Sequence, residues 1–315
     1  MREKYIFGPV ASRRLGVSLG VDLVKPKCCT LDCVYCEAGK TTDLTLERRE
    51  YVPVGEVIAE LDRFLAARPT LDYITFSGAG EPTLNSRIGD VVRFVKEKHP
   101  EYRLCLLTNG TLLNDAALRR EVEGVDLYVP NFDASTDEEL AAVNRPAPGV
   151  TVESLAEGIR ALCREQPGKV VLELFIVPGV NDGDASIARF VAYIRSFGVA
   201  KVQLNTLDRP GCVDWIRPSD AANTRRFIAA LEGVVPVEAV GRFRYKSPEL
   251  CRKLATDEFD ASILALIARR PATLENLVQA LGAEPERVRQ RIALLLEAGK
   301  ITAEKQPRGE FYALP

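Results

Sequence analysis

The chain has 315 residues, of which 46% are hydrophobic and 27% are charged, and its formal net charge is −2. This apolar fraction excludes a disordered chain, and the length corresponds to one large domain with a small one, or to two domains. No apolar run reaches the ~18 residues of a membrane span, and no signal-type stretch follows the charged start. The sequence therefore predicts a cytoplasmic protein without a membrane partner.

The histidine content restricts the chemistry. The chain has one histidine, His99, directly before Pro100, where a helix should end. Histidine-rich zinc sites, two-histidine iron sites and histidine-based triads all need more imidazoles or a better placed one. Any demanding chemistry must therefore come from the carboxylates or from the eight cysteines, which do not resemble the disulfide framework of a short secreted chain.

A repeating strand and helix pattern fills the first 255 residues. Six apolar, β-branched runs predict strands at residues 16–24, 72–77, 102–108, 125–130, 170–177 and 201–206, and a short run at 234–240 is a candidate edge strand. Amphipathic periodicities lie between most of them, as at Val57, Leu61 and Leu65. This alternation predicts an α/β fold with a parallel sheet, and six units fit a partial (βα)6 barrel over residues 1–255.

Small and polar residues follow five of the predicted strands. They occupy residues 77–82, 108–110, 131–133, 178–182 and 205–206. In a barrel the carboxyl ends of the strands meet at one face, so these loops are expected to form a site there. The alternative is that Gly, Asn and Asp serve only as turn residues.

The pattern changes near residue 256. Helices are expected over residues 258–270, 274–281 and 285–298, followed by a hairpin over 301–314, and this order resembles a winged helix-turn-helix over residues 256–315. Eight acidic and eight basic residues lie in 258–315, so the basic footprint of most DNA-binding modules is missing. Arg287, Arg289 and Arg291 concentrate on the third helix, which leaves nucleic-acid contact, protein docking or a substrate lid open.

A compact cysteine motif follows the first of these predicted strands. Cys29, Cys33 and Cys36 have the spacing C-x3-C-x2-C. Three thiolates can hold a cubane iron–sulfur cluster and leave one iron without a protein ligand, whereas structural zinc needs four ligands and electron-transfer clusters use four cysteines. Cys28 is a poor fourth ligand because it is adjacent to Cys29. The spacing therefore favours a cluster that binds a substrate or cofactor directly.

This loop, with an aromatic residue before its last cysteine, resembles the radical S-adenosylmethionine (radical SAM) superfamily. Further similar motifs follow the next four strands: Gly78-Ala79-Gly80-Glu81-Pro82, Thr108-Asn109-Gly110, Asn131 with Asp133, and a looser match around Val177. The resemblance covers residues 5–245. Segments 5–16, 77–84, 143–146 and 203–210 resemble more closely a prokaryotic group related to the wyosine-forming tRNA-modification enzymes, which informs fold and cofactor more than substrate.

The resemblance implies that Cys29, Cys33 and Cys36 hold a [4Fe–4S] cluster whose open iron chelates S-adenosylmethionine. The implied cofactor contacts are Tyr35, Gly78, Ala79, Gly80, Glu81, Asn109, Asn131, Asp133 and Val177, with Glu81 orienting the ammonium and Tyr35 covering the adenine. One electron, from a donor such as flavodoxin or ferredoxin, would cleave the cofactor to a 5′-deoxyadenosyl radical. That radical would abstract hydrogen from the substrate.

The substrate is less defined, and the sequence identifies no catalytic residue. The candidates for substrate contact are Arg145, Glu173, Asn205 and Arg209. We expect a nucleobase, nucleoside or tRNA base, and the alternatives are a maturase or activase acting on a protein or peptide, and a redox-sensing regulator that binds nucleic acid through the winged helix. The remaining cysteines, at 105, 163, 212 and 251, show no ligand pairing for an auxiliary cluster.

Overall fold

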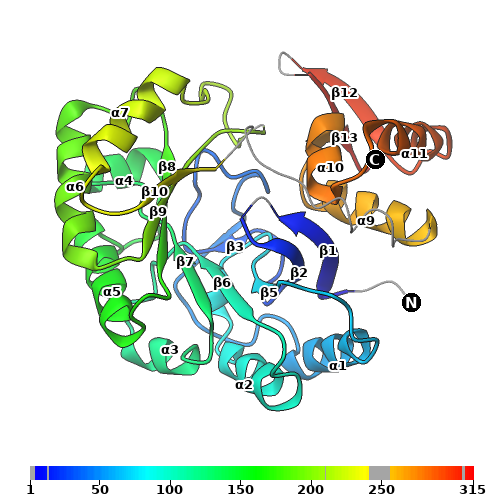
Figure 1. Cartoon of the computed structure of the whole chain (residues 1–315), viewed down its shortest axis with the longest axis horizontal. Helices are drawn as coiled ribbons and strands as arrows, with labels where there is room; N and C mark the ends of the chain where they lie inside the picture. The colour runs from blue at the N-terminus through cyan, green and yellow to red at the C-terminus, as the bar shows by residue number, and fades with distance from the viewer. Residues whose placement is uncertain (1–3, 13, 210, 241–255, 307–308) are drawn as a thin grey trace.

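The computed structural model describes residues 4–12, 14–209, 211–240, 256–306 and 309–315. Two sheets run through its larger part (Figure 1). The first has the order β1 (Ile6–Ser12), β2 (Gly16–Val21), β5 (Tyr73–Phe76), β6 (Leu104–Thr108) and β7 (Leu127–Pro130), in which only β1 is antiparallel to its neighbour. The second has the order β10 (Val237–Ala239), β9 (Lys201–Thr206) and β8 (Val171–Ile176), all parallel.

Parallel bridges join the two sheets. They pair Tyr128 with Val170 and Asn131 with Glu173. The six parallel strands from β2 to β9 lie in the runs that the sequence predicts, and β10 lies in the expected edge run. The predicted α/β fold is therefore confirmed. The hairpin partner β1 was not expected, because its sequence IFGPVAS contains Gly8 and Pro9 and lacks a clear alternation.

Helices follow the strands and cover one face of the sheets. They are α1 (Val54–Leu65), α2 (Ile88–Lys98), α3 (Ala116–Glu121), α4 (Asp137–Val143), α5 (Val152–Glu165), α6 (Asp184–Phe197) and α7 (Ala221–Leu231), with the short helix η1 at Pro82–Leu84 and the short strands β3 (Cys28–Cys29) and β4 (Asp43–Leu44). Ile74 and Phe76 of β5 belong to the core beneath the helices. Because side chains alternate along a strand, Thr75 points to the opposite face, where its hydroxyl meets that of Ser18 at 2.6 Å.

One glycine in α5 marks a close contact between a helix and a loop. A Cβ atom at Gly158 would lie 2.6 Å from the backbone nitrogen of Asn114 and 2.6 Å from the carbonyl carbon of Leu113. We expect Gly158→Ala to lower the free energy of unfolding by about 2 kcal/mol, because this overpacking outweighs the better helix propensity of alanine. At Gly55 in α1 an added Cβ atom would meet no other part of the protein within 4 Å. Gly55→Ala should therefore raise the free energy of unfolding by about 0.5 kcal/mol. Urea unfolding of both variants tests this, and equal effects would contradict it.

The C-terminal part contains α9 (Thr256–Arg269), β11 (Ala272–Thr273), α10 (Leu274–Leu281), α11 (Pro285–Glu297), β12 (Thr302–Gln306) and β13 (Gly309–Ala313). Its three strands form an antiparallel sheet in the order β11-β13-β12, and its helices bury a separate apolar cluster around Phe259, Leu277 and Ile292. The three helices and the hairpin lie where the sequence predicts them. The predicted domain boundary at residue 255 falls outside the described residues and stays a prediction.

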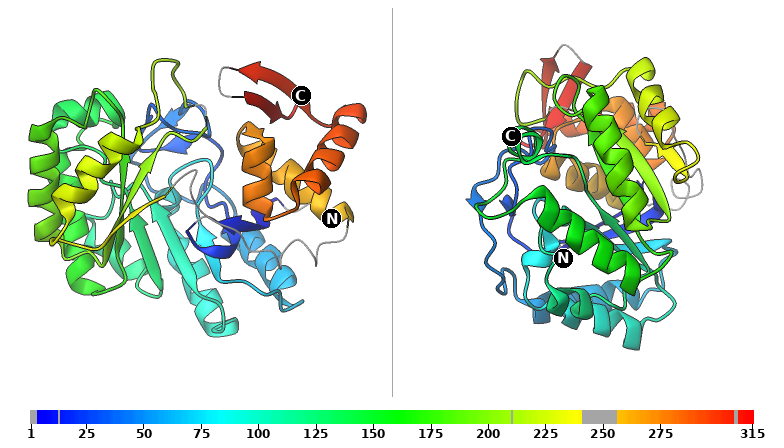
Figure 2. Two further views of the ribbon diagram at one scale, coloured as in Figure 1. Left: turned by 45° about the horizontal axis from the view of Figure 1, so that its top comes forward. Right: turned by 90° about the vertical axis from the view of Figure 1, so that its left-hand side faces the viewer.

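The C-terminal part packs beside the β1–β2 hairpin, away from α5, α6 and α7 (Figures 1 and 2). Helices α9 and α10 both contact β1. Within the described residues, no helix has the length and apolar character needed to span a membrane.

Candidate functional site

The three cysteines of the motif lie in the loop that follows β2. Main-chain hydrogen bonds fix this loop against the end of α4, from Val34 N to Val143 O at 2.9 Å and from Asp32 N to Asn144 O at 2.9 Å. All seven cysteines that the structure describes are free thiols. No three His, Cys, Asp or Glu side chains in the described part come close enough to hold a single metal ion. This geometry does not fit a mononuclear zinc site, whereas a cubane cluster separates its ligands more widely.

Each cysteine of the motif accepts a hydrogen bond from a nitrogen donor. Nδ2 of Asn109 lies 3.5 Å from Cys29 Sγ, and Nδ2 of Asn144 lies 3.3 Å from Cys33 Sγ. The third donor is the ammonium of Lys27, 3.5 Å from Cys36 Sγ. The sequence did not single out Lys27, whereas Asn144 is one of the polar residues that it places at the mouth of the predicted barrel as candidates for substrate or cofactor contact.

The three thiols differ in their electrostatics. Burial raises the pKa of Cys29 to about 12, and burial also holds the pKa of Cys33 well above its usual value. The pKa of Cys36 is instead lowered to about 6, by the hydrogen bond from the Cys212 thiol and by the Lys27 ammonium. Cys212 also donates to the carbonyl oxygen of Cys36 at 3.3 Å.

The remaining cysteines do not come together. Cys105 on β6 and Cys163 on α5 are buried in separate apolar clusters, and Cys251 lies outside the described residues. The wide spacing of the single cysteines along the chain does not indicate the contact between Cys212 and Cys36.

The loop after β5 is in close contact with the cysteine loop. The main-chain nitrogen of Lys27 donates to Ala79 O at 2.7 Å. A Cβ atom at Gly80 would lie 2.1 Å from the carbonyl oxygen of Cys28, and Gly78 has φ +142°. Glycine at position 80 is therefore required by the approach of the protein's own backbone.

Glu81 ties this loop to the end of β6. Its Oε1 accepts hydrogen bonds from Thr83 N at 3.1 Å, Thr83 Oγ1 at 2.6 Å and Thr108 Oγ1 at 2.7 Å, and its Oε2 accepts one from Asn109 N at 2.8 Å. The side chain is 2% exposed, and burial raises its pKa although these hydrogen bonds oppose the shift. The carboxylate thus positions Asn109, the donor to Cys29.

Asp133 joins the cysteine loop to the ends of β7 and β8. It accepts hydrogen bonds from the Tyr35 hydroxyl, from Asn144 Nδ2 at 3.0 Å and from Phe175 N at 2.8 Å, and Asn131 Nδ2 lies 3.5 Å away. Burial raises the pKa of Asp133 against the effect of these donors. The Tyr35 ring stacks on Phe175 with centroids 3.8 Å apart, and the two rings share a small apolar cluster with Val177. The sequence-predicted residues of these three loops are therefore brought together.

The four candidates for substrate contact divide into separate groups. Glu173 accepts a hydrogen bond from Asn205 Nδ2 at 2.8 Å and pairs with Arg14 of the β1–β2 hairpin. Arg209 is 6% exposed and lies 3.4 Å from Glu37. Arg145, whose side chain is 40% exposed, instead lies 3.8 Å from Asp32.

A cavity of about 280 Å³ lies between the inner face of the sheet and the C-terminal part. Its lining includes Ser18 and Thr75 of the sheet and Ser77 directly after β5, together with Arg14 and Arg209, and the C-terminal part contributes Leu266, Arg270 and Ala280. The guanidinium of Arg270 reaches Glu37, next to Cys36, at 2.5 Å. The C-terminal part therefore forms one wall of this cavity and contacts the cysteine loop.

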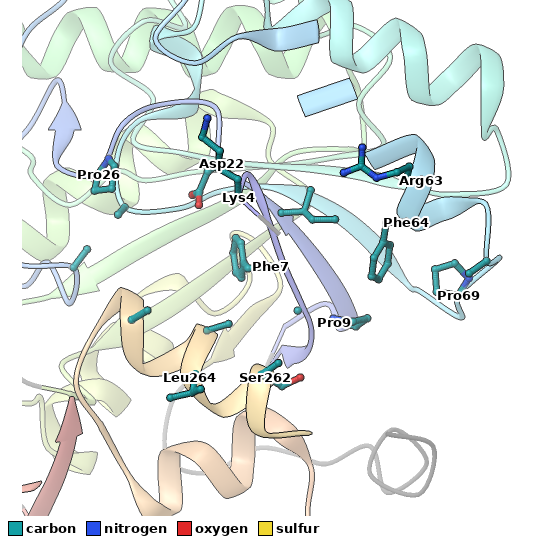
Figure 3. A pocket seen from close by; sticks show the side chains of 18 of the residues that line it. Lys4, Phe7, Pro9, Asp22, Pro26, Arg63, Phe64, Pro69, Ser262 and Leu264 are labelled. Atoms are coloured by element: carbon teal, nitrogen blue, oxygen red, sulfur yellow. The ribbon is translucent and has the colours of Figure 1, made fainter. Parts of the chain in front are cut away.

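A larger groove of about 1200 Å³ opens between β1, α1 and α9 (Figure 3). Phe7, Phe64 and Leu264 line it from these three elements, and Lys27 and Ala79 line it next to the cysteine loop. The groove thus extends from the interface of the two parts to the donor of Cys36.

The arginines of α11 are engaged within the C-terminal part. The Arg287 guanidinium lies 4.4 Å over the ring of Phe259, Arg289 pairs with Glu286 at 2.5 Å, and Arg291 Nε donates to Asp260 at 2.7 Å. These contacts weaken the expectation that the helix presents a basic surface to nucleic acid.

Comparison with known proteins finds relatives in sequence and in structure. A protein of Brachyspira hyodysenteriae named "GTPase Obg" is 26% identical to this chain over 96% of the chain's length. The matched part covers 44% of that protein. A UPF0026 protein of Helicobacter pylori is 27% identical, over 98% of this chain and 96% of its own. The crystal structure of a radical SAM methyltransferase from Sphaerobacter thermophilus superposes with a TM-score of 0.55 at 22% identity, over 73% of this chain and 66% of that one. It supports the fold.

The family model of the radical SAM superfamily matches residues 23–191, which is more than half of the chain. The match includes the cysteine motif and the loops after β5, β6, β7 and β8. The chain therefore belongs to the radical SAM superfamily, and it is an iron–sulfur enzyme whose cofactors are a [4Fe–4S] cluster and S-adenosylmethionine.

Proposed function

We propose that Cys29, Cys33 and Cys36 bind the cluster, and that S-adenosylmethionine lies between the cysteine loop and the loops after β5 to β8. The observation that carries this assignment is that three loops send one nitrogen donor each to the three thiols, at 3.3 to 3.5 Å. N–H donors stabilise the thiolate form that binds iron, and they are a recurrent feature around iron–sulfur clusters.

Two orphaned oxygens support the cofactor fit. Among the described residues, Oδ1 of Asn144 and Oε1 of Gln203 are buried without a hydrogen-bond partner. Buried acceptors are costly unless a donor reaches them. The ammonium, the ribose hydroxyls and the adenine amino group of S-adenosylmethionine are donors of the required kind. Asn144 also donates to Cys33, so its orphaned oxygen lies on the amide that contacts the cluster site.

The bound cofactors supply one-electron cleavage of the sulfonium and abstraction of hydrogen from the substrate. The chain's residues hold these reactants in place and exclude water. Lys27, Asn109 and Asn144 donate to the thiolates, and Glu81 fixes Asn109 through the hydrogen bond from its main-chain nitrogen. Tyr35, stacked on Phe175, closes the apolar side of the site.

The substrate we propose is a nucleobase, a nucleoside or a tRNA base, and it would occupy the 280 Å³ cavity beneath the C-terminal part. The cavity approaches the size of small-molecule sites, and a base on RNA would have to be extruded to enter it. Arg14, Arg209 and Arg270 line it as well, although Glu173 pairs with the first and Glu37 with the other two, so a ribose phosphate would share these arginines with the carboxylates. The resemblance of segments 5–16, 77–84, 143–146 and 203–210 to a group related to the wyosine-forming enzymes is the sequence argument for this class.

We further propose that residues 1–255 form a partial (βα)6 barrel and residues 256–315 a winged-helix domain. The six parallel strands, with helices between them, support the first assignment. The order of three helices and a hairpin supports the second. In this arrangement the small domain acts as a wall of the substrate cavity, and its contact with nucleic acid depends on surfaces other than the three engaged arginines of α11. The electron would come from a flavodoxin or ferredoxin.

A second candidate substrate is a protein or peptide, as for a maturase or activase. The groove of about 1200 Å³ favours it, since an extended chain could lie between β1 and α9 and reach the cysteine loop.

Substrate stimulation separates these classes. The reduced holoenzyme is incubated with S-adenosylmethionine and with either the four common ribonucleosides or total unmodified tRNA, and 5′-deoxyadenosine is quantified. We expect one of the two additions to increase its rate of formation at least tenfold, and Cys33→Ser provides the blank. If neither raises the rate although the cofactor is cleaved slowly without substrate, the nucleic-acid assignment is wrong.

A further inference from the structure

The environment of Cys36 differs from that of the other two motif cysteines. Asn109 and Asn144 provide neutral amides to Cys29 and Cys33, whereas the sulfur of Cys36 lies 3.5 Å from the ammonium of Lys27. A charged donor makes a stronger hydrogen bond than a neutral one. Among the three donors described, the charged one, the Lys27 ammonium, therefore lies beside the sulfur of Cys36 alone.

The backbone of Lys27 supports a functional role for its side chain. Lys27 has φ +67°, in the left-handed region where glycine is preferred. Its main chain is held there by hydrogen bonds, from its nitrogen to Ala79 O at 2.7 Å, and to its oxygen from Thr42 N at 3.0 Å and Asp43 N at 3.1 Å. Glycine would adopt this conformation more easily, so lysine at this position carries a backbone cost. Strained residues of this kind are concentrated at functional sites.

We propose that Lys27 is a positioning residue that raises the reduction potential of the cluster through its ammonium on Cys36, with Asn109 and Asn144 acting more weakly on Cys29 and Cys33. This inference rests on the proposed function, because it requires the three cysteines to be the ligands. Reduction adds one electron, and part of that charge resides on the thiolate sulfurs. A donor or a positive charge at the sulfur therefore stabilises the reduced form more than the oxidised form.

The geometry gives Lys27 a second relevant property. Lys27 is among the residues that line the groove between β1, α1 and α9, and it is not among those that line the 280 Å³ cavity. A substitution at Lys27 therefore changes the charge beside Cys36 without replacing a residue that lines the cavity assigned to the substrate.

The test is a redox titration of the full chain, reconstituted anaerobically and followed by the electron paramagnetic resonance of the reduced cluster, with dithionite as the reductant. Lys27→Met removes the charge and the donor at nearly constant length. We expect it to lower the equilibrium constant for reduction about tenfold, which is 59 mV for a one-electron couple. Asn109→Ala and Asn144→Ala should each lower that constant about threefold.

Matched variants separate a local effect from a general one. Lys25→Met removes an exposed charge two residues away, and it should leave the titration unchanged. Lys27→Arg keeps a charged donor and should stay near the wild type, while Lys27→Gln keeps only a neutral donor and should fall between the wild type and Lys27→Met. If Lys27→Met does not retain a cluster, the test rests on the reduction potentials of the other three proteins. The wild type and Lys27→Arg should then have similar potentials, and Lys27→Gln a lower one.

The outcomes are distinguishable from a failure of the proposed function. A bound cluster whose potential is the same in the wild type, Lys27→Gln and Lys27→Met overturns the role of Lys27 and leaves the cysteine ligands in place. A wild-type chain that takes up no cluster, or a cluster that survives in Cys33→Ala, instead overturns the ligand assignment on which the inference rests.

Discussion

Cys33→Ala should abolish cluster binding. Cys33 is the middle residue of the motif, and removing one of three thiolates leaves two irons without a protein ligand. After anaerobic reconstitution we expect the iron and sulfide content of the variant to fall at least tenfold below that of the wild type. The visible absorption of the cluster should disappear in parallel.

The matched control is Cys163→Ala. Cys163 is buried on α5 within the main core, so its loss removes one thiol that lies outside the motif. This variant should retain the wild-type content of iron and sulfide and lose only about 1 kcal/mol of stability. Equal cluster contents in Cys33→Ala and the wild type would show that Cys33 is not a ligand.

Glu81→Ala should cause the largest loss of stability among single substitutions at the site. The carboxylate accepts the main-chain N–H groups of Thr83 and Asn109 and two threonine hydroxyls, and it is nearly inaccessible to solvent. Buried donors left without an acceptor cost about 1 to 3 kcal/mol each. We expect the free energy of unfolding to fall by about 3 kcal/mol in urea unfolding followed by circular dichroism.

Glu97→Ala provides the comparison, because Glu97 is an exposed residue of α2 and undergoes the same change. Its effect should stay within about 0.5 kcal/mol. A change at Glu81 as small as that at Glu97 would contradict the role of Glu81 in joining the loops after β5 and β6. A stable Glu81→Ala protein with full cluster content would also show that Asn109 holds its position without that hydrogen bond.

The sequence predicts the parallel part of the fold well, because continuous apolar strands that alternate with amphipathic helices are typical of a parallel sheet covered by helices. It does not predict β1, whose Gly8 and Pro9 interrupt the alternation on which strand assignment depends. The hairpin matters for function, since it brings Arg14 to Glu173, a residue 159 positions further along the chain. No local pattern indicates a contact at that separation.

The site shows the same division. The cysteine spacing and the loops after successive strands can be predicted, since they depend on local motifs and on the common edge of parallel strands. The partners of the sulfurs can be predicted only in part: Asn109 and Asn144 are polar residues at the expected site, but the contact of Asn144 with Cys33 depends on the packing of loops 111 residues apart, and no motif marks Lys27 as the donor to Cys36. Glu81 illustrates the limit most clearly. The family motif suggests a contact with the cofactor, and the structure gives its carboxylate four donors from the protein.

The sequence leaves three interpretations of the C-terminal part open: nucleic-acid contact, protein docking and a substrate lid. In the structure this part lines one side of the 280 Å³ cavity. The charge balance of residues 258–315 reduced the weight of nucleic-acid binding, and the contact of Arg270 with Glu37 indicates a connection to the cysteine loop. Of the three arginines of α11, Arg287 contacts Phe259 and Arg291 pairs with Asp260, while Arg289, whose side chain is 59% exposed, pairs with Glu286 on the surface.

The most direct measurement is the formation of 5′-deoxyadenosine by the anaerobically reconstituted chain, supplied with dithionite and S-adenosylmethionine. We predict that the wild type forms the nucleoside and that Cys29→Ala, Cys33→Ala and Cys36→Ala each reduce its yield to the level of the protein-free blank. A wild-type chain that holds its cluster, forms no 5′-deoxyadenosine and binds DNA according to its oxidation state would contradict the enzymatic account and identify a redox-sensing regulator.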